Sequence, residues 1–321
     1  MRKSLLVFFL LSWFCTASLH AQTLPHTTDS IRQAHKAFEA LSMQRDASWR
    51  HRISKLERYY QDHFSAYLRS PESMRAMPVD DVRLVYETAR AVAFYSGKAA
   101  YADDALVALN ALRARHAENK ADLQHLYRTY ISTRQFTNAR QLAQQHPSLD
   151  VKPLPTIDDH VMDNPDARPT VLTVSAETGH VDHVVAPPLQ DTQIVVIAHP
   201  LCHFTRDAVR DLVRHPTLWK LLTQHAVWIA PQDGNVEFDA FQHWNKAIPA
   251  AHINIAYQQS DWTMIDYWGT PTFFFLKHGK VVDRVTGWPK EGRVDALLAG
   301  MRAIGLDVAG IGLTPATAAS K

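Results

Sequence analysis

The stretch that decides the fold is QIVVIAHPLCHFT, residues 193–205. Its first part, Ile194 to Ala198, is a continuous apolar run of the kind found in strands buried on both faces. A lone cysteine, Cys202, follows shortly after, and residues 203–224 then carry apolar side chains at helical spacing. The pattern therefore predicts a thiol at the junction between a central strand and the first turn of a helix.

Strand-like segments surround this stretch on both sides. Residues 170–175 and 180–185 alternate in polarity about a short turn and predict a hairpin, while 226–230 and 252–257 predict two further strands. Later comes GTPTFFFLKHGK, residues 269–280, in which two strand runs flank a Lys-His-Gly-Lys turn. A final helix is predicted over 289–304.

The order of these elements, with Cys202 at a strand-to-helix junction, resembles the thioredoxin-like superfamily. The resemblance covers roughly residues 168–306 and is strongest at Gly269-Thr270-Pro271-Thr272, at the phenylalanine-rich strand that follows, and at Gly287. Within the superfamily it is most similar to the exported TlpA/DsbE-like branch, which carries an extra N-terminal hairpin. It implies that Pro271 is cis and lies beside the active-site cysteine, and that Thr270 and Pro271 present the backbone of a bound substrate.

The active-site loop departs from the family motif Trp-Cys-x-x-Cys. Leu201 stands in the Trp position, Thr205 replaces the second Cys, and Val196 occupies the place of a buried acid that assists proton transfer. A Cys-x-x-Thr site cannot form the internal disulfide that stores two electrons. The predicted catalytic set is therefore a monothiol: Cys202, with Thr205 and His203 beside it.

A thiol at a helix N-terminus is expected to have a lowered pKa, because unpaired backbone N–H groups and the positive end of the helix dipole favour the thiolate. Thr205 could add a hydrogen bond, and His203 and Arg206 positive charge. Such a thiolate could attack a partner disulfide and form a mixed disulfide. The leading hypothesis is monothiol exchange with a protein or a low-molecular-weight thiol, in an isomerase-like, reductase or client-holding role. Whether this amounts to enzymatic turnover stays open.

Two alternatives compete with this hypothesis. The first is a redox-inactive thioredoxin fold kept as an interaction or scaffold module. The second is a copper or zinc site, for which His199, Cys202 and His203 offer nitrogen and sulfur ligands in one loop, with His278 as a further ligand. No cofactor is predicted. Other catalytic signatures are absent from the sequence: it has no Gly-x-Ser-x-Gly motif, no phosphate loop and no His-Glu-x-x-His motif.

The N-terminus predicts export. A positively charged start, an apolar run from Ser4 to Cys15 and small residues at Ala17 and Ala21 make up the three parts of a signal peptide over 1–21. We expect a periplasmic or extracellular protein without a stable membrane span. After cleavage Cys202 is the remaining cysteine, so no intramolecular disulfide is expected. The formal net charge of +2 gives no reason to expect a nucleic-acid partner.

The residues between the signal peptide and the predicted thioredoxin-like region show helical periodicity. Apolar residues recur three or four apart over 30–68, and shorter helices are predicted over 80–95, 101–116, 121–133 and 136–145. Short turns between them suggest stacked antiparallel pairs, either a degenerate tetratricopeptide-like module that captures a protein partner or a plain helical domain.

The predicted fold class is therefore α+β with two domains, an N-terminal all-α domain and a C-terminal thioredoxin-like α/β domain. The predicted boundaries are 22–149 for the helical domain, 150–168 for a linker, 169–306 for the thioredoxin-like domain and 307–321 for a flexible tail. The linker contains Pro153, Pro155 and Pro165, with Pro169 directly after it, and a small group of Asp158, Asp159, His160 and Asp163. A solvated linker is expected there, with metal binding as the alternative.

Overall fold

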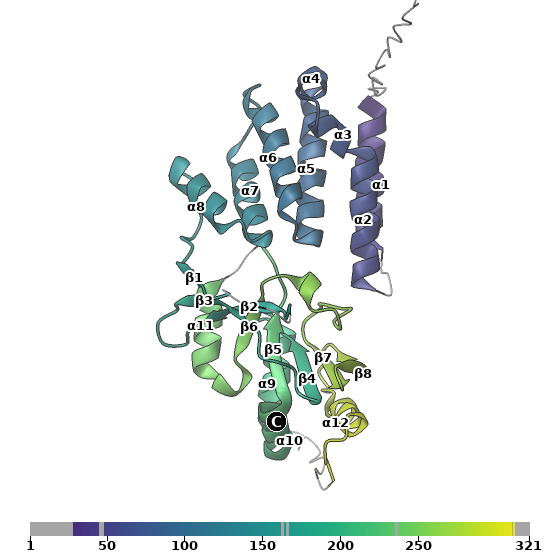
Figure 1. The fold of residues 1–321 in the computed structure, drawn as a ribbon, viewed down its shortest axis with the longest axis vertical. Coiled ribbons are helices and arrows are strands. Elements are labelled where there is room, and N and C mark those ends of the chain that lie inside the picture. The colour runs from purple at the N-terminus through teal and green to yellow at the C-terminus, as the bar shows by residue number, and fades with distance from the viewer. Residues whose placement is uncertain are drawn as a thin grey trace, which may run out of the picture.

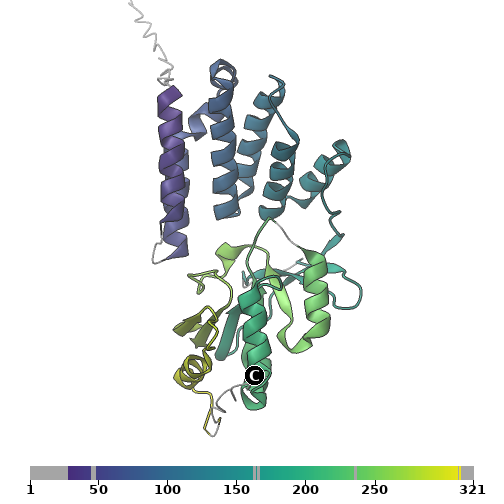
Figure 2. The same ribbon diagram turned by 180° about the vertical axis from the view of Figure 1, so that it is seen from behind.

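The computed structural model describes residues 28–44, 48–161, 164, 167–234, 237–309 and 311. Helices fill one end of this part of the molecule, and a sheet with four further α-helices fills the other (Figures 1 and 2). The predicted signal peptide lies outside the described residues, as does most of the predicted tail. Val308, inside the predicted tail, is buried at 3% exposure. No helix among the described residues is long and apolar enough to cross a membrane.

The helical end consists of helices that pack side by side, as the periodicity predicts. Their bounds are α1 Thr28–Met43, α2 Trp49–His63, α3 Ser65–Leu68, α4 Pro71–Ala76, α5 Val79–Ser96, α6 Ala99–Arg113, α7 Lys120–Ser132 and α8 Phe136–Gln145. Helix α5 ends at Gly97, whose φ of 68° is the left-handed conformation that glycine adopts without steric cost. Only Gly97 and Lys98 separate α5 from α6, so the two helices form an antiparallel hairpin.

The other end is built on one sheet. Its strands are β1 Ile157–Asp159, β2 Thr170–Val174, β3 Val181–Val185, β4 Thr192–Ile197, β5 Ala226–Ala230, β6 Ile253–Ala256, β7 Thr272–Lys277 and β8 Lys280–Thr286, in the spatial order β1-β3-β2-β6-β5-β4-β7-β8. Strands β2 and β3 pair antiparallel, which confirms the predicted hairpin. Strand β4 runs parallel to β5 and antiparallel to β7, so it lies inside the sheet with neighbours on both sides.

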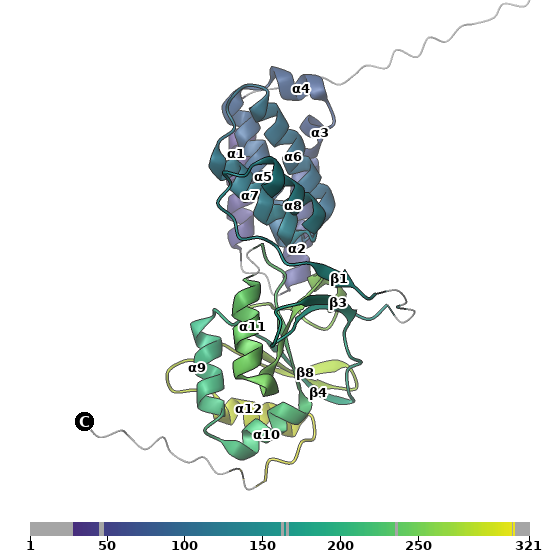
Figure 3. The ribbon, with the colours of Figure 1, turned by 90° about the vertical axis from the view of Figure 1, so that its left-hand side faces the viewer.

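The apolar run around residue 195 is buried on both faces of this sheet, as predicted. Ile194 and Val196 face a core that includes side chains of α9 His203–Leu212, α10 Pro216–His225, α11 Phe238–Ala247 and α12 Val294–Ala303. Val195 and Ile197 face the opposite side. There the cover is the segment between β6 and β7, through Trp262, Ile265 and Trp268, with Trp49 of α2 packed against it. The four helices α9 to α12 lie together on the other face of the sheet (Figure 3).

The order of elements agrees with the thioredoxin-like fold that the resemblance implies. Cys202 immediately precedes α9, which follows the internal strand β4. The Thr270–Pro271 peptide bond is cis, and Pro271 immediately precedes β7, the antiparallel neighbour of β4. Strand β8 and helix α12 complete the order.

One element lies where the sequence predicts a linker. Strand β1 falls inside residues 150–168 and pairs in parallel with β3, extending the sheet by one edge strand. Three residues are too few to show a strand pattern in the sequence. The pairing depends on β3, which only the folded sheet brings alongside.

Polar side chains fasten the helical end to the sheet end. Arg134, directly after α7, is buried at 7% exposure and donates to the carbonyl oxygens of Tyr257 at 2.9 Å and Ala256 at 2.6 Å. Arg50 in α2 donates to the carbonyls of Ser260 at 3.1 Å and Trp262 at 2.9 Å. The two ends are therefore joined by charge-assisted hydrogen bonds to carbonyls at the end of β6 and in the loop that follows it.

Candidate functional site

Cys202 is the N-cap residue of α9. Its φ of −73° and ψ of 118° are extended, and its carbonyl accepts from the amide of Arg206 at 3.1 Å, which begins the helix. The thiol is free and partly exposed. In its neutral form Sγ donates to the carbonyl oxygen of Thr270 at 3.4 Å. The predicted pair of Cys202 and the Thr270–Pro271 segment is thus brought together across two neighbouring strands.

Thr205 lies one turn into α9 and is fully buried at 0% exposure. Its hydroxyl oxygen accepts from the backbone amide of His199 at 3.4 Å. A hydroxyl that accepts this bond still has its own proton to donate. The side chain of Thr205 also forms a hydrogen bond to Cys202 that favours the thiolate. Thr205 therefore links the strand end to the thiol, in the position that a second cysteine would have.

The pKa of Cys202 lies below its ordinary value. Burial raises it, but hydrogen bonds from the Thr270 side chain, from the backbone and side chain of Thr205, and from the backbone of Phe204 together outweigh burial. The Thr270 carbonyl favours the thiol, whereas these donors favour the thiolate. The shift comes from hydrogen bonding by Thr270 and by the first turn of α9, rather than from the positive charges that the sequence suggested.

The histidines of this loop have different surroundings. His203 is exposed, and its ring lies against Phe204 with centroids 3.8 Å apart. The ring of His199 is partly buried, with Nδ1 accepting from the amide of Leu201 at 3.1 Å and Nε2 lying 3.7 Å from a carboxylate oxygen of Asp233. Burial lowers the pKa of His199, and Asp233 partly offsets the effect. His199 is therefore neutral at pH 7 and already engaged through Nδ1.

The loop histidines do not form a ligand cluster with the thiol. Among the described residues, His199, Cys202 and His203 are not a group whose ligand atoms lie within 4.8 Å of one another. His278, the further ligand considered, forms an ion pair with Asp191 instead. A copper or zinc site at Cys202 therefore has no support in this geometry.

A cleft of about 1010 Å³ opens beside the thiol. The sheet end contributes Cys202, His199 and Thr270, and also Asp233, which follows β5. The helical end contributes the start of α2 and the end of α5. Its lining residues there are Trp49, Arg52, Phe94 and Tyr95. The helical part thus forms one wall of the cleft that contains the thiol.

The helical wall of the cleft is aromatic and basic. Trp49 packs edge to face on Trp268 with centroids 6.5 Å apart, and its amide donates to the carbonyl of Asp266 at 3.0 Å. The guanidinium of Arg52 lies 5.7 Å from the centroid of the Tyr95 ring. Within the described part of the chain, Arg52 Nε and Trp268 Nε1 are buried donors that have no hydrogen-bond partner.

Sequence reasoning did not find these cleft residues. Asp233 had a usable signal, because it follows β5 and the carboxyl ends of the parallel strands β4 and β5 meet at one edge of the sheet. The sequence carries no comparable signal for the residues of the helical wall, Trp49, Arg52, Phe94 and Tyr95. Their periodicity places them on helices, but it does not say which helix ends would meet a sheet far along the chain.

Comparisons with known proteins add little to this picture. No protein-family model and no curated protein sequence matches the chain. The crystal structure of a thioredoxin-like protein from Bacteroides caccae aligns with 94% of this chain and 99% of its own, at 11% identity and a TM-score of 0.29. A TM-score this low does not establish a shared fold. The thioredoxin-like assignment therefore rests on the order and pairing of the strands around Cys202.

Proposed function

We propose that this chain acts by monothiol thiol–disulfide exchange through Cys202. The observation that carries the proposal is the thiol's environment: a partly exposed Sγ at the start of α9, with a pKa lowered by donors from Thr205, Phe204 and Thr270 despite burial. A larger thiolate fraction at neutral pH makes a cysteine more reactive toward disulfides. Thr205 stands where a resolving cysteine would act, and its hydroxyl cannot displace the partner from Cys202. Within this site the reaction therefore ends at the mixed disulfide.

The exchange step involves one bond formed and one broken. The Cys202 thiolate attacks one sulfur of a partner disulfide, a new sulfur–sulfur bond joins the partner to Cys202, and the partner's other sulfur leaves as a thiolate that takes a proton from water. Cys202 is oxidised and the leaving sulfur is reduced. Release needs a second thiol, supplied by the client protein or by a low-molecular-weight thiol. With Thr205 in place of a resolving cysteine, that thiol comes from outside the site.

The cleft favours a partner with hydrogen-bond acceptors and apolar groups. Arg52 lines the cleft, and its guanidinium is a group that a carbonyl or carboxylate of the partner could accept hydrogen bonds from. Around the thiol, Leu201, Phe204 and Tyr267 are large apolar side chains that stay 44–55% exposed. A polypeptide segment that presents a disulfide between apolar residues matches both features.

The test is adduct formation with glutathione disulfide, followed by intact mass spectrometry. The protein carries Cys15→Ser, so that Cys202 is its sole thiol. We expect a single adduct at pH 7 that forms at least about tenfold faster than in the same chain unfolded in denaturant, and none in Cys202→Ala. His203→Ala is the control and should keep the rate, since His203 is exposed and is not among the groups that lower the pKa. Equal rates in folded and unfolded chains would refute the proposal.

A redox-inactive interaction module is the second candidate, favoured by the same exposed apolar residues. It predicts that Cys202→Ala binds its partner as tightly as the wild-type chain. Monothiol exchange predicts that the covalent complex, trapped with an alkylating agent and resolved without reductant, is lost in this variant. The two outcomes separate the candidates.

We further propose that the protein is exported to the periplasm or the extracellular space. The support is the N-terminal pattern of residues 1–21 alone. Sequencing the N-terminus of the protein recovered from a host's exported fraction tests this, with Gln22 as the expected first residue. Recovery of an intact Met1 from the cytoplasmic fraction would contradict it.

A further inference from the structure

Two Asp and two His side chains gather at the edge of the sheet, away from the cleft. Strands β1 and β3 pair in register at Asp158 and Asp182, so these two carboxylates lie side by side. His160 and His180 are each two residues from one of them along the chain. Alternate residues of an extended chain point to the same face. The pattern Asp158-x-His160 beside His180-x-Asp182 therefore places four potential ligands on one face of two adjacent strands.

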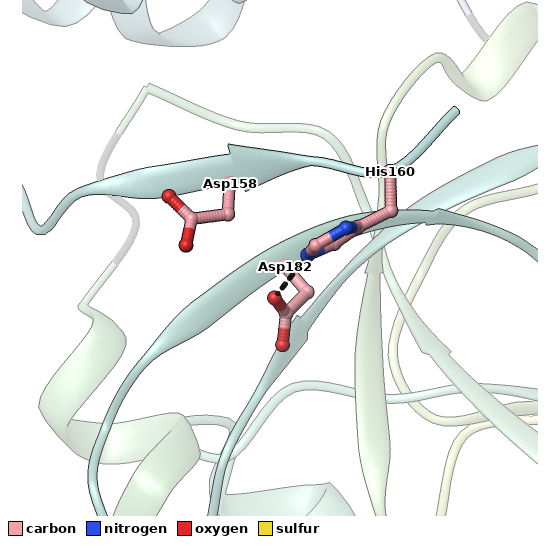
Figure 4. A group of neighbouring side chains, drawn as sticks. All are labelled: Asp158, His160 and Asp182. Atoms are coloured by element: carbon pink, nitrogen blue, oxygen red, sulfur yellow. Dashed lines mark hydrogen bonds and ion pairs between the residues drawn. The ribbon is translucent and has the colours of Figure 1, made fainter. Parts of the chain in front are cut away.

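The distances between these side chains are short. Nε2 of His180 is 3.2 Å from Oδ2 of Asp158 and 3.2 Å from Oδ1 of Asp182, and Nε2 of His160 is 2.9 Å from Oδ1 of Asp182. One ligand atom each from Asp158, His160 and Asp182 lie within 4.8 Å of one another, and His180 contacts both carboxylates from beside this group. Figure 4 shows Asp158, His160 and Asp182 on the two strands. All four side chains are 29–58% exposed, so an ion can reach them.

The paired carboxylates need a positive charge. Like charges directly opposite each other on neighbouring strands are destabilising. Within the described residues, no Lys or Arg forms an ion pair with either carboxylate, and their partners are the two imidazoles. A cation bound between the strands would offset both carboxylates and accept the nitrogen lone pairs of the two imidazoles, so it would satisfy all four side chains at once.

We propose that Asp158, His160, His180 and Asp182 bind one divalent transition-metal ion, of which Zn²⁺ fits best. Zinc takes four His nitrogen and carboxylate oxygen ligands at about 2.0–2.2 Å in a tetrahedron, which sets neighbouring ligand atoms about 3.3 Å apart. The His160–Asp182, His180–Asp158 and His180–Asp182 contacts, at 2.9–3.2 Å, are close to this spacing. Calcium and magnesium prefer sites of oxygen ligands alone, so the two histidines favour zinc.

Such an ion would fasten the edge of the sheet. Strand β1 is three residues long and pairs with β3 alone, so its own backbone bonds hold it weakly. Two ligands come from β1 and the residue after it, and two from β3 and the residue before it. Four protein ligands leave no open coordination position, which indicates a structural site rather than a catalytic one. The ion would thus hold the segment that leads from the helical end onto the sheet.

The experiment measures zinc retention by the full chain. The protein is loaded with Zn²⁺, dialysed against metal-free buffer and analysed for zinc per chain, and its affinity is measured by competition with a chromophoric chelator. We expect one ion in the wild-type chain and an affinity reduced by roughly 100-fold in the near-isosteric Asp182→Asn. Co²⁺ in place of Zn²⁺ should give the visible absorption of tetrahedral cobalt, which Asp182→Asn loses.

Two control variants make the result specific. Asp159→Asn should retain zinc. Asp159 pairs with His183 at 3.1 Å, and it lies on the opposite face of the strand from Asp158 and His160. Cys202→Ala should also retain it, which excludes binding at the thiol. No retained zinc in the wild-type chain, or the same affinity in Asp182→Asn, would show that the four side chains form only an ion-pair network and would overturn the proposal. If Asp182→Asn fails to fold, His180→Gln replaces it.

Discussion

At the scale of single residues, the thiol's reactivity depends on where its hydrogen-bond partners lie. Thr205 is fully buried, and its hydroxyl accepts from the His199 amide while its own proton stays available to Cys202. His203 and Arg206, which were expected to add positive charge, are exposed and do not contribute to the lowered pKa. The local sequence Cys-x-x-Thr thus places a buried hydroxyl, and no second sulfur, one turn after the thiol.

Replacing Thr205 with valine should slow the alkylation of the Cys202 thiol. The substitution keeps the shape and removes the hydroxyl, so the Cys202 pKa should rise and alkylation at pH 7 should fall roughly tenfold, as expected for one hydrogen bond to a charged group. Thr272→Val is the matched control, because Thr272 is equally buried but donates to the carbonyl of Gly269 at 2.7 Å. Equal alkylation rates in the two variants would remove Thr205 from the site.

The lowered pKa also predicts how stability depends on pH. Because the folded Cys202 loses its proton at a lower pH than the unfolded chain, thiolate formation stabilises the fold above the unfolded pKa of about 8.5, and this contribution is lost as pH falls through the folded pKa. The free energy of unfolding of the wild-type chain, relative to that of Cys202→Ala, should therefore increase as the pH rises from the folded pKa of Cys202 to the unfolded one. Urea titrations across this range measure it, and a flat or falling difference would contradict the lowered pKa.

At the scale of elements, strand pairing and helix approach determine what the sequence could reveal. The buried run of β4, the hairpin β2–β3 and the hairpin β7–β8 follow from period and turn residues, and all three are present. Strand β1 was missed because three residues show no period. The position of α12 depends on Gly300, where a Cβ atom would lie 2.4 Å from the Phe275 ring, a contact between residues remote in sequence.

Gly300→Ala should therefore destabilise the protein although it raises helix propensity. Alanine favours a helix interior by about 1 kcal/mol over glycine, but overpacking against the fully buried Phe275 costs about 1–3 kcal/mol. Chemical denaturation should show a net loss of stability. The matched control is Ala299→Gly on the exposed side of α12, which should lose about 1 kcal/mol from propensity alone. A stabilised Gly300→Ala would show that α12 can move away from β7.

At the scale of the whole molecule, the helical part matters because it supplies a wall of the cleft. The sequence predicts both the helical and the thioredoxin-like halves, but not that Trp49 and Tyr95 would lie across from Cys202. This juxtaposition depends on Arg50 and Arg134, whose guanidinium groups donate to carbonyls at the end of β6 and in the loop that follows it. Hydrogen bonds between a helix end and a distant loop leave no periodic signal in the sequence.

Arg134→Met should weaken the connection between the two ends. The variant keeps an apolar side chain of similar length but leaves the carbonyls of Ala256 and Tyr257 without their donor, which should cost about 2–4 kcal/mol. Arg128→Met on the same stretch of chain is the control, since Arg128 is exposed and its loss should change stability by less than about 0.5 kcal/mol. Urea denaturation compares them, and equal midpoints would mean that Arg134 does not hold the two ends together.

The most direct test of the account is the pKa of Cys202 itself. The rate of alkylation by iodoacetamide is measured against pH for the full chain carrying Cys15→Ser, folded and then unfolded in denaturant. The account predicts a midpoint for the folded chain clearly below that of the unfolded chain, since hydrogen bonds from Thr205, Phe204 and Thr270 outweigh burial. A folded midpoint equal to or above the unfolded one would contradict an activated thiol and leave the fold as a binding module.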